Sequence, residues 1–499
     1  MKPLIRESLE SRRQHSSALE MALLVVLATA LRVFRLGTKS LWLDEAMSIT
    51  LVQLGWHDFL RALVHRQANM ALYYFLLRMW IRLGTTEWLV RSLSVIAGVA
   101  TIPAIYLLGK ILFGPRVGKI AAALCCFHVF LIRYSQEARG YSLVVLLAAL
   151  SSYFFVLSIR NPSLKNWGAY VATSVLMVYA QVFGGWVLIS QWASLLLLRR
   201  HVPWRRFLCS AALISLLISP LAYCLFFLSD RSQLAWLKKP SVGDLYNFSF
   251  DLTGDGGFLL LLMNLALLVV ALSGVLREWR SSDTGDLWSY AFVATWLCLP
   301  VVLLVMISWR SPVFLPRFLI FCVPPLVFLV AQGLNRLRSK IIFATAGIVF
   351  LGLSLSGDFS YYRNRSDAEH TDDWRNATRY ILSRAEVGDA VLFTYSEERL
   401  VFDQYQRQLN LTDQGAVEYP QGSDVELLTR APSRPDDQLL AGMVRSHSRV
   451  WVISAYQPGP VSRHVAQELG SHFNDHAVRD FGFVRTDLFS QPIPAAQIP

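Results

Sequence analysis

The sequence predicts an all-α polytopic membrane protein with about eleven transmembrane helices and a C-terminal extracytoplasmic α/β domain. The 499 residues are 54% hydrophobic and only 16% charged, whereas soluble domains carry about 25% charged residues. Many apolar runs reach the roughly 20 residues that a helix needs to cross a bilayer. Residues 358–499 lack such runs and alternate helix-like with short strand-like patterns. We therefore expect a membrane domain at 1–357 and an extracytoplasmic domain at 358–499.

The candidate spans follow one another from the N-terminus, mostly with short connections. The first apolar run ends in Arg32 and Arg35 rather than in a small-residue cleavage site, which favours an uncleaved span. The stretch 167–198 allows either one tilted helix or two short helices broken at Phe183-Gly184-Gly185. The predicted spans lie at about 19–36, 88–109, 119–133, 141–159, 167–181, 183–198, 207–228, 257–276, 288–307, 317–334 and 341–357.

Positive charge decides between these two topologies. The formal net charge of +12 could indicate nucleic-acid binding, but much of the excess lies in short loops, where Lys and Arg mark the cytoplasmic side. We therefore expect membrane lipids as partners and no nucleic acid. Two short helices at 167–198 place the basic loops on one side, and these loops hold Lys110, Arg116, Arg160, Lys165, Arg205, Arg206, Arg336, Arg338 and Lys340, among others.

This topology predicts a multi-pass protein with a cytoplasmic N-terminus and an outer C-terminal domain, in a bacterial inner or plasma membrane. The six cysteines show no metal-binding spacing and no disulfide framework. In the tail, "DDWRNATRYILSRA" and "SRHVAQELGSHF" predict helices, and "DAVLFTY" and "SRVWVISAY" predict buried strands. The tail contains no glycine-rich phosphate loop, so it is expected to bind an acceptor or partner, or to cap the membrane domain.

Three outer segments gather polar residues beside the hydrocarbon, where such residues are costly and usually functional. They are the loop 37–87 with "LWLDEAMSIT", the turn "RYSQEARGYS" at 133–142, and "SWRSPVFLPRF" at 308–318. Within 37–87, apolar residues recur at helical spacing, which predicts amphipathic helices lying on the membrane surface. The alternative is that these surface helices have no chemical role.

Asp44 and Glu45 are the first candidate catalytic residues. Adjacent residues on a helix point about 100° apart, so one carboxylate can face a cavity while the other makes a structural ion pair. A carboxylate at the edge of the low-dielectric region, near a lipid-borne substrate, can serve as a general base. The alternative is an anion at a helix N-terminus or a topology charge.

The turn at 133–142 supplies candidate substrate-binding residues. If it is helical, Tyr134, Glu137 and Tyr141 share one face and can hydrogen-bond a sugar, while Arg139 can bind an anion. The alternative for the tyrosines is an aromatic belt at the interface. Arg310 and Arg317 in the third segment are further candidate phosphate ligands, because arginine binds phosphate in a fork. Their alternative is contact with ordinary phospholipid.

The ordered motifs "LWLDEA", "NMALYYFLLRMW", "RYSQEARGYSL" and "VFLPRFLIFCVPPL" resemble those of the GT-C superfamily of membrane glycosyltransferases. The resemblance covers most of 19–357 and is to the glycosyltransferase family 39-like group, which includes protein O-mannosyltransferases and aminoarabinose transferases. It implies a GT-C fold and a donor sugar carried on a polyprenyl phosphate. It also implies Asp44 as the catalytic base of an inverting displacement, with Arg139 and Arg317 as candidate ligands of the leaving phosphate.

The resemblance also makes Asn69, Tyr73 and Tyr74 candidate substrate-binding residues. Many members of the group read His-Pro where this chain has Asn69-Met70, so the role of that histidine cannot be carried over, and nearby His65 is added to the candidates. Some GT-C enzymes use a divalent cation and others do not. Asp44 and Glu45 alone are too few ligands to define a metal site, so no cofactor is assigned.

The sequence thus favours a polyprenyl-phosphate-dependent hexosyl or pentosyl transferase of the cell envelope, acting on a hydroxyl of a glycan, lipid or protein acceptor. The alternative is a polytopic transporter or a lipid or glycolipid flippase without transferase activity. Transporters often contain internal repeats and broken helices at the bilayer midplane. The chain shows no clear repeat, and its polar residues cluster at one surface, which favours the enzyme.

Overall fold

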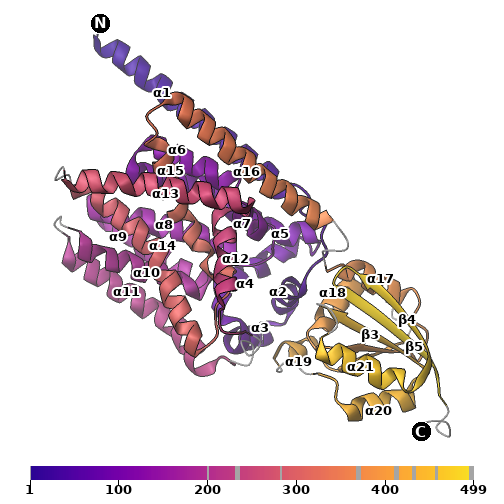
Figure 1. The fold of residues 1–499 in the computed structure, drawn as a ribbon. Helices are drawn as coiled ribbons and strands as arrows, with labels where there is room; N and C mark the ends of the chain where they lie inside the picture. Colours follow the sequence, from indigo (N-terminus) through magenta and orange to yellow (C-terminus); the bar gives the residue numbers. More distant parts are fainter. Residues whose placement is uncertain are drawn as a thin grey trace.

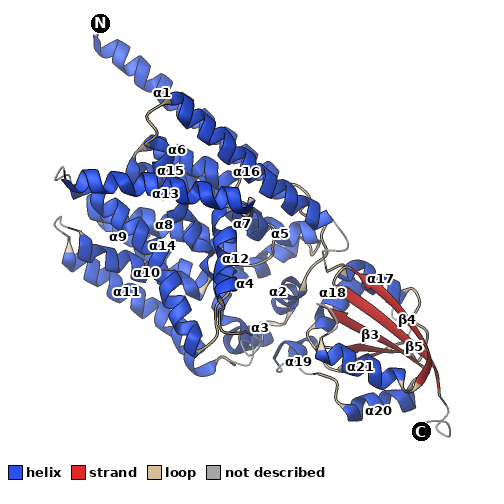
Figure 2. Ribbon diagram, in the orientation of Figure 1, coloured by secondary structure: helices blue, strands red, loops and turns tan. Residues whose placement is uncertain are grey.

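The computed structural model describes residues 2–198, 202–230, 237–280, 284–366, 372–409, 415–429, 434–455 and 459–493, with side chains from residue 17 onward except at 274, 276–286 and 364–366. A large helical part is joined to a smaller domain built around one sheet (Figures 1 and 2). The helical part contains α1 (Lys2–Val33), α2 (Leu43–Gln53), α3 (Trp56–Ala62), α4 (Ala71–Trp80), α5 (Glu87–Phe113), α6 (Pro115–Cys126), α7 (Val129–Ser135), α8 (Tyr141–Arg160), α9 (Leu164–Ala180), α10 (Gly185–Ser194), α11 (Trp204–Tyr223), α12 (Val242–Thr253), α13 (Gly257–Arg280), α14 (Thr284–Arg310), α15 (Val323–Asn335) and α16 (Lys340–Ser366).

The predicted spans all fall on helices. Within the described residues, six helices are long and apolar enough to cross a membrane, or up to eight if two bent pairs each count as one span. The pairs are α6 with α7, bent by 60°, and α12 with α13, bent by 76°. The multi-pass helical class is therefore confirmed, and the number eleven stays a prediction.

The stretch 167–198 is a hairpin of two helices, not one tilted helix. At one end of the hairpin, the Tyr170 hydroxyl near the start of α9 donates to Gln191 near the end of α10, at 2.9 Å. At the other end, Gly184 packs against Met177. The chain reverses after Gln181, whose extended backbone ends α9.

The basic loops meet at one end of the bundle. Arg160 lies within hydrogen-bond distance of Ser289 (3.4 Å), Arg206 donates to the carbonyl of Pro162 (2.6 Å), and Arg336 donates to the Tyr290 hydroxyl (2.6 Å). The three predicted outer segments lie away from this end. This arrangement is the one that the positive charges predict, while the assignment of the basic end to the cytoplasm stays a prediction.

The loop 37–87 contains α2, the two surface helices α3 and α4, and short π- and 3₁₀-helical turns, including η1 (Leu63–Gln67), η2 (Ala68–Met70) and η3 (Ile81–Leu83). Both surface helices bury one side against the protein and leave large apolar residues exposed on the other: Trp56, Leu60, Phe75, Leu76 and Met79. Such exposed apolar faces are typical of helices that lie in a membrane interface. Their position on a membrane surface stays a prediction.

The C-terminal domain is an α/β unit, and its four predicted elements are present. Its sheet has the strand order β2-β1-β3-β5-β4, in which β1 is parallel to β2 and β3, and β5 is antiparallel to β3 and β4. The hairpin β4–β5 was not predicted. The elements are α17 (Trp374–Leu382), β1 (Ala390–Phe393), α18 (Glu398–Leu409), β2 (Val417–Tyr419), α19 (Asp424–Thr429), α20 (Asp437–Ser446), β3 (Arg449–Ala455), α21 (Pro460–Gly470), β4 (Phe473–Phe481) and β5 (Val484–Pro492).

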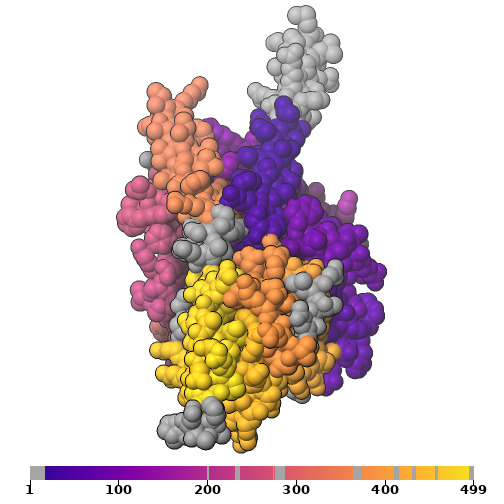
Figure 3. Space-filling model, turned by 90° about the vertical axis from the view of Figure 1, so that its right-hand side faces the viewer, coloured from indigo at the N-terminus to yellow at the C-terminus, as the bar shows by residue number. Residues whose placement is uncertain are grey.

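The junction between the two parts lies later than the expected boundary at 357, because α16 continues to Ser366. Helix α16 runs beside α1 along one edge of the bundle (Figure 1), where Phe34 and Tyr362 pack edge to face with ring centroids 5.1 Å apart. The C-terminal domain then packs directly against the helical part (Figure 3). Contacts between the two parts include those of α18 with α2, those of α19 with α2, α3 and η1, and the ion pair of Arg375 in α17 with Glu87 in α5.

Candidate functional site

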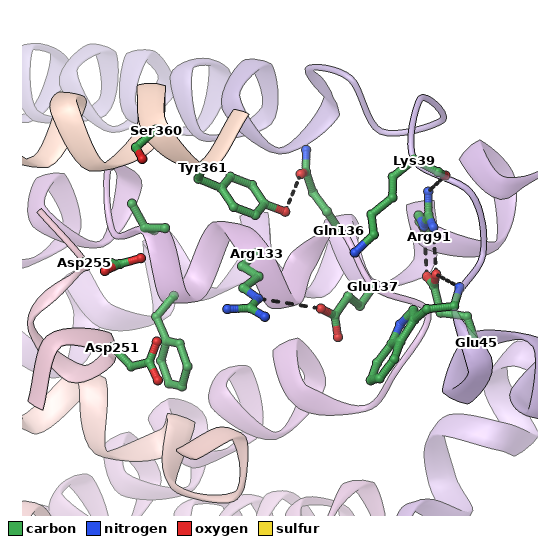
Figure 4. A pocket seen from close by; sticks show the side chains of 13 residues that line it. Lys39, Glu45, Arg91, Arg133, Gln136, Glu137, Asp251, Asp255, Ser360 and Tyr361 are labelled. Atoms are coloured by element: carbon green, nitrogen blue, oxygen red, sulfur yellow. Dashed lines mark hydrogen bonds and ion pairs between the residues drawn. The ribbon is translucent and has the colours of Figure 1, made fainter. Parts of the chain in front are cut away.

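The segment before α2 is held in place by Arg91 of α5. Its guanidinium donates to the carbonyls of Leu36, Lys39 and Ser40 at 2.8–3.0 Å and to both carboxylate oxygens of Glu45 at 2.8 and 2.6 Å. Both side chains are almost completely buried, and the pair is visible in Figure 4. The ion pair and these hydrogen bonds therefore fix the conformation of the segment that leads into α2.

This geometry corrects the expectation that Glu45 is catalytic. Its Oε1 also accepts the backbone N–H of Ala138 at 2.8 Å, so Glu45 ties the start of α2 to the turn at 136–140. The two adjacent carboxylates thus divide their roles, as the helical geometry allowed. Glu45 is the structural member of the pair, and Asp44 is left as the candidate base.

Asp44 lies in the first turn of α2, where the helix dipole favours an anion. Its side chain is 23% exposed and faces two guanidinium groups, with Oδ2 at 3.8 Å from Arg139 and 3.6 Å from Arg317. Both distances are longer than a normal N–H···O hydrogen bond. The three groups therefore form a partly exposed charged cluster without a close hydrogen bond between the carboxylate and either guanidinium group.

Arg139 is positioned by side chains of the outer loop. One of its nitrogens donates to the Tyr74 hydroxyl at 2.9 Å and lies 3.4 Å from Ser48 Oγ. The Arg139 carbonyl accepts from Ser94, which shares a hydrogen bond with Tyr73. Tyr73 and Tyr74 were predicted to bind substrate. In the structure both are buried, and they hold Arg139 in place instead.

Arg317 comes from η8 (Pro316–Cys322), the turn that links α14 to α15. The next residue, Phe318, stacks on Phe183 of the α9–α10 turn with ring centroids 4.5 Å apart. The Arg317 guanidinium lies 5.5 Å from the ring centroid of Trp42, a cation–π contact. Three segments distant in sequence therefore meet at this cluster.

The segment 136–140 is a turn rather than the helix considered above. α7 ends at Ser135 and α8 begins at Tyr141. The turn still brings Tyr134 and Tyr141 together, with ring centroids 4.9 Å apart, and Tyr141 lies near Arg139, whose guanidinium is 6.0 Å from its ring centroid.

Glu137 lies in the same turn, beside the charged cluster. Its Oε1 is 4.0 Å from Arg133, and its Oε2 is buried without a hydrogen-bond partner among the described residues. Burial raises the pKa of this carboxyl above its ordinary value, although nearby Arg133 opposes the shift. Glu137 is therefore a buried acceptor available to a ligand.

Three predicted residues are not joined to the Asp44 cluster by any hydrogen bond or ion pair within the described part of the chain. His65 is exposed in η1, and its ring nitrogen bonds the carbonyl of Leu228. Arg310 is exposed at the end of α14. Asn69 lies in η2 with a buried Oδ1 that has no hydrogen-bond partner there. The structure gives His65 and Arg310 no role at the cluster.

Sequence reasoning missed Arg91 and Trp42. Arg91 had a signal, because an arginine inside an apolar span is costly unless it is paired. Trp42 had none beyond its place beside Asp44.

Where the structure describes side chains, no group of three or more His, Cys, Asp or Glu residues is placed to hold a metal.

Residues 70–224 match a family model described as dolichyl-phosphate-mannose-protein mannosyltransferase. No curated protein matches the sequence. The fold is similar to that of ArnT from Cupriavidus metallidurans in the apo state, with a TM-score of 0.65 at 11% identity over 93% of this chain and 97% of that chain. The same protein bound to undecaprenyl phosphate gives 0.62 at 12% identity, with the same coverage.

The apo form of the Archaeoglobus fulgidus oligosaccharyltransferase is also similar, with a TM-score of 0.52 at 12% identity over 88% of this chain and 69% of that chain. At such low identity the solved structures show a shared fold. Together with the family match, they confirm the resemblance to GT-C membrane glycosyltransferases.

Proposed function

We propose that this chain, which has the GT-C fold, transfers a hexosyl or pentosyl group from a polyprenyl-phosphate donor to a hydroxyl of a glycan, lipid or protein acceptor. The reaction takes place at the outer surface of the membrane and inverts the anomeric carbon. Asp44 is the general base, and Arg139 and Arg317 bind the donor phosphate.

The observation that carries this proposal is the cluster of Asp44 with two guanidinium groups at 3.6 and 3.8 Å. A base and two phosphate-binding cations are the groups that this displacement needs, and here they share one partly exposed site. Hydrogen bonds to Tyr74 and contact with Trp42 orient the two arginines before any substrate binds.

In the proposed step, the acceptor oxygen attacks the anomeric carbon and its proton passes to the Asp44 carboxylate. The bond between the anomeric carbon and the phosphate oxygen breaks, and its electron pair leaves with the polyprenyl phosphate. The arginines stabilise the charge that develops on the leaving phosphate, because preorganised cations in a partly desolvated site favour that charge.

The choice of donor rests on two similarities. The family description names a dolichyl-phosphate sugar, and the similar ArnT structure is bound to undecaprenyl phosphate. The alternative, a transporter or flippase, places its site near the bilayer midplane. In this chain the charged cluster lies at the end of the bundle that carries the surface helices, opposite the basic loops.

We expect Asp44→Asn to abolish transfer while the chain still folds and inserts, because the amide keeps the side chain's shape but cannot accept the proton. The test complements a deletion strain with wild type or variant and measures polyprenyl-linked sugars by mass spectrometry. The deletion and Asp44→Asn strains should accumulate one lipid-linked sugar, and wild type should clear it.

Asp58→Asn is the matched control, since Asp58 lies in the same loop, on α3, and its 41% exposed side chain pairs only with exposed His57 among the described residues. It should clear the donor like wild type. Clearance by Asp44→Asn would remove the proposed base. Unchanged lipid pools in the deletion strain, together with altered lipid export, would favour the transporter instead.

A further inference from the structure

A polar cavity adjoins the charged cluster through Trp42, which lines the cavity and also contacts Arg317. It has a volume of about 230 Å³, and Asp44, Arg139 and Arg317 are not among its lining residues. Figure 4 shows Arg133 near its centre, with Glu137 on one side and Asp251 on the other. Lys39 and Tyr361 line it from further segments, and the Tyr361 hydroxyl donates to the Gln136 amide oxygen at 3.0 Å (Figure 4).

Two broken helices form one wall of this cavity. Arg133 lines the cavity from α7, just after the α6–α7 break, Asp251 lines it from the last turn of α12, and Asp255 lines it from the α12–α13 break itself. The breaks touch each other, because His128 Nε2 lies 3.1 Å from the carbonyl of Leu252. At membrane depth, irregular backbone is tolerated where it is buried in protein or lines a polar cavity.

The backbone is also unusual at this wall. Asp255 has a positive φ of 53°, a conformation that side-chain-bearing residues adopt rarely and often at functional sites. Its neighbour Gly256 allows the close packing of the break, since a Cβ there would lie 2.7 Å from the carbonyl of Leu353, and Gly254 has a positive φ of 100° that favours glycine. The chain therefore maintains this cavity at a conformational cost.

The lining indicates what the cavity binds. Apart from the Arg91–Glu45 pair, it carries two cations and three carboxylates, which disfavours a phosphate. Carboxylates accept hydrogen bonds from hydroxyls, and Arg133 and Lys39 donate them. The rings of Trp42, Phe130 and Tyr361 offer apolar faces. Aromatic faces combined with planar polar groups suit a hydroxyl-rich ring.

We propose that this cavity binds a sugar ring beside the charged cluster of Asp44, Arg139 and Arg317. Glu137, Arg133 and Asp251 are the groups that hydrogen-bond the sugar. The buried and unpartnered Oε2 of Glu137 is an acceptor for one sugar hydroxyl. This inference rests on the proposed function. The ring belongs either to the donor or to the acceptor, and the experiment below separates these two sources.

The test fills the cavity from α16, where Ser360 lines it. Ser360→Trp should lower transfer about tenfold or more, measured as donor accumulation in the complemented deletion strain. Ser356→Trp is the matched control, because Ser356 is exposed one turn earlier on the same helix and does not line the cavity. The control should clear the donor like wild type.

Purified wild type and Ser360→Trp are then titrated with bare undecaprenyl phosphate and with the lipid-linked sugar from the deletion strain. Bare undecaprenyl phosphate should bind both proteins equally. Weaker binding of the lipid-linked sugar alone assigns the cavity to the donor sugar. Equal binding of both lipids with lost transfer assigns it to an acceptor sugar. Wild-type clearance by Ser360→Trp overturns the proposal.

The same cavity can also be filled chemically after the protein has folded, so that a loss of transfer cannot be due to misfolding. Ser360→Cys, in a chain whose exposed Cys209 and Cys298 are replaced by serine, is allowed to fold and is then labelled with a bulky thiol reagent. Labelling should remove transfer, and labelling of Ser356→Cys should not. If Asp44→Asn accumulates donor but the labelled Ser360→Cys protein transfers normally, the cavity proposal fails while the proposed function stands.

Discussion

At the scale of single residues, two neighbouring carboxylates have opposite environments. Asp44 is 23% exposed and lies 3.6 and 3.8 Å from two arginines, whereas the Glu45 side chain is fully buried and bound by Arg91 at 2.6 Å. The difference follows from the helix, which points adjacent side chains about 100° apart. One face of α2 therefore presents Asp44 to the charged cluster, and another face attaches the helix to α5 through Glu45.

We expect Glu45→Gln to destabilise the chain by about 3–5 kcal/mol, because it leaves the Arg91 charge buried without its partner. Thermal unfolding in detergent measures the change, with Asp44→Asn as the neighbouring control. Asp44→Asn should unfold close to wild type. An unchanged unfolding temperature for Glu45→Gln would contradict the structural role given to this ion pair.

At the scale of elements, the segment that leads into α2 is held from the C-terminal domain as well as from α5. The Leu41 N–H donates to the Tyr405 hydroxyl of α18 at 2.6 Å, and that hydroxyl donates to Glu87 at 3.0 Å. Arg375 of α17 also binds Glu87, at 2.7 Å. These bonds form a relay that ends three residues before Asp44.

We expect Tyr405→Phe to slow transfer about fivefold, because one lost hydrogen bond is worth about 1 kcal/mol and the segment before Asp44 becomes less well placed. Hydrogen–deuterium exchange should show faster exchange at Leu41, while affinity for undecaprenyl phosphate stays unchanged. Tyr419→Phe is the control, since the Tyr419 hydroxyl bonds His447 within the C-terminal domain. Unchanged exchange at Leu41 would exclude the relay.

The first residue of α18, Glu398, is a buried titratable group of the C-terminal domain. Its carboxylate accepts from the N–H groups of Tyr395 and Ala455 and from the Thr394 hydroxyl. Burial nevertheless raises its pKa from 4.5 to about 7. Between these values the folded chain holds a proton that the unfolded chain releases, so this group's contribution to stability decreases as pH rises from 4.5 to 7.

We expect thermal unfolding of the full chain between pH 5 and 8 to show this decrease, with a slope of up to about 1.4 kcal/mol per pH unit. Glu398→Gln should flatten the profile, because it removes the titrating group. Glu468→Gln, on partly exposed α21, should leave the profile as in wild type. A profile unchanged by Glu398→Gln would assign the pH dependence to other groups.

Sequence patterns predicted the positions of most helices and strands, but not how these elements pack against one another. The spans were recognisable because apolar composition and length are local properties, and the tail's strands were recognisable from short apolar runs. The break at Gln181, the turn at 136–140 and the extension of α16 to Ser366 depend on packing between segments far apart in the chain. A single sequence does not show that packing.

The candidate site was predicted in part for the same reason. Polar residues beside apolar runs pointed to Asp44, Arg139 and Arg317, because such placements are costly without a function. Composition could not show that Glu45 would form a buried ion pair with Arg91, or that Tyr73 and Tyr74 would hold Arg139 in place. Those outcomes depend on which side chains face one another across the bundle.

At the scale of the whole molecule, the basic loops lie at one end and the charged cluster and C-terminal domain lie at the other. We expect Ser383→Cys, exposed on the C-terminal domain, to react in intact cells with an impermeant maleimide. Arg338→Cys, exposed at the basic end, should react only after permeabilisation. Cys209 and Cys298 are replaced by serine in both variants. Reversed labelling would invert the topology and place the cluster in the cytoplasm.

The relay from Tyr405 and Arg375 to the segment before Asp44 also has a consequence for biogenesis. The membrane helices are synthesised and inserted first, and the domain that braces the acidic residue emerges afterwards. Until that domain is made, the segment before Asp44 lacks its hydrogen bond to Tyr405, so under the proposed function we expect an unfinished chain to transfer sugar more slowly than the complete chain.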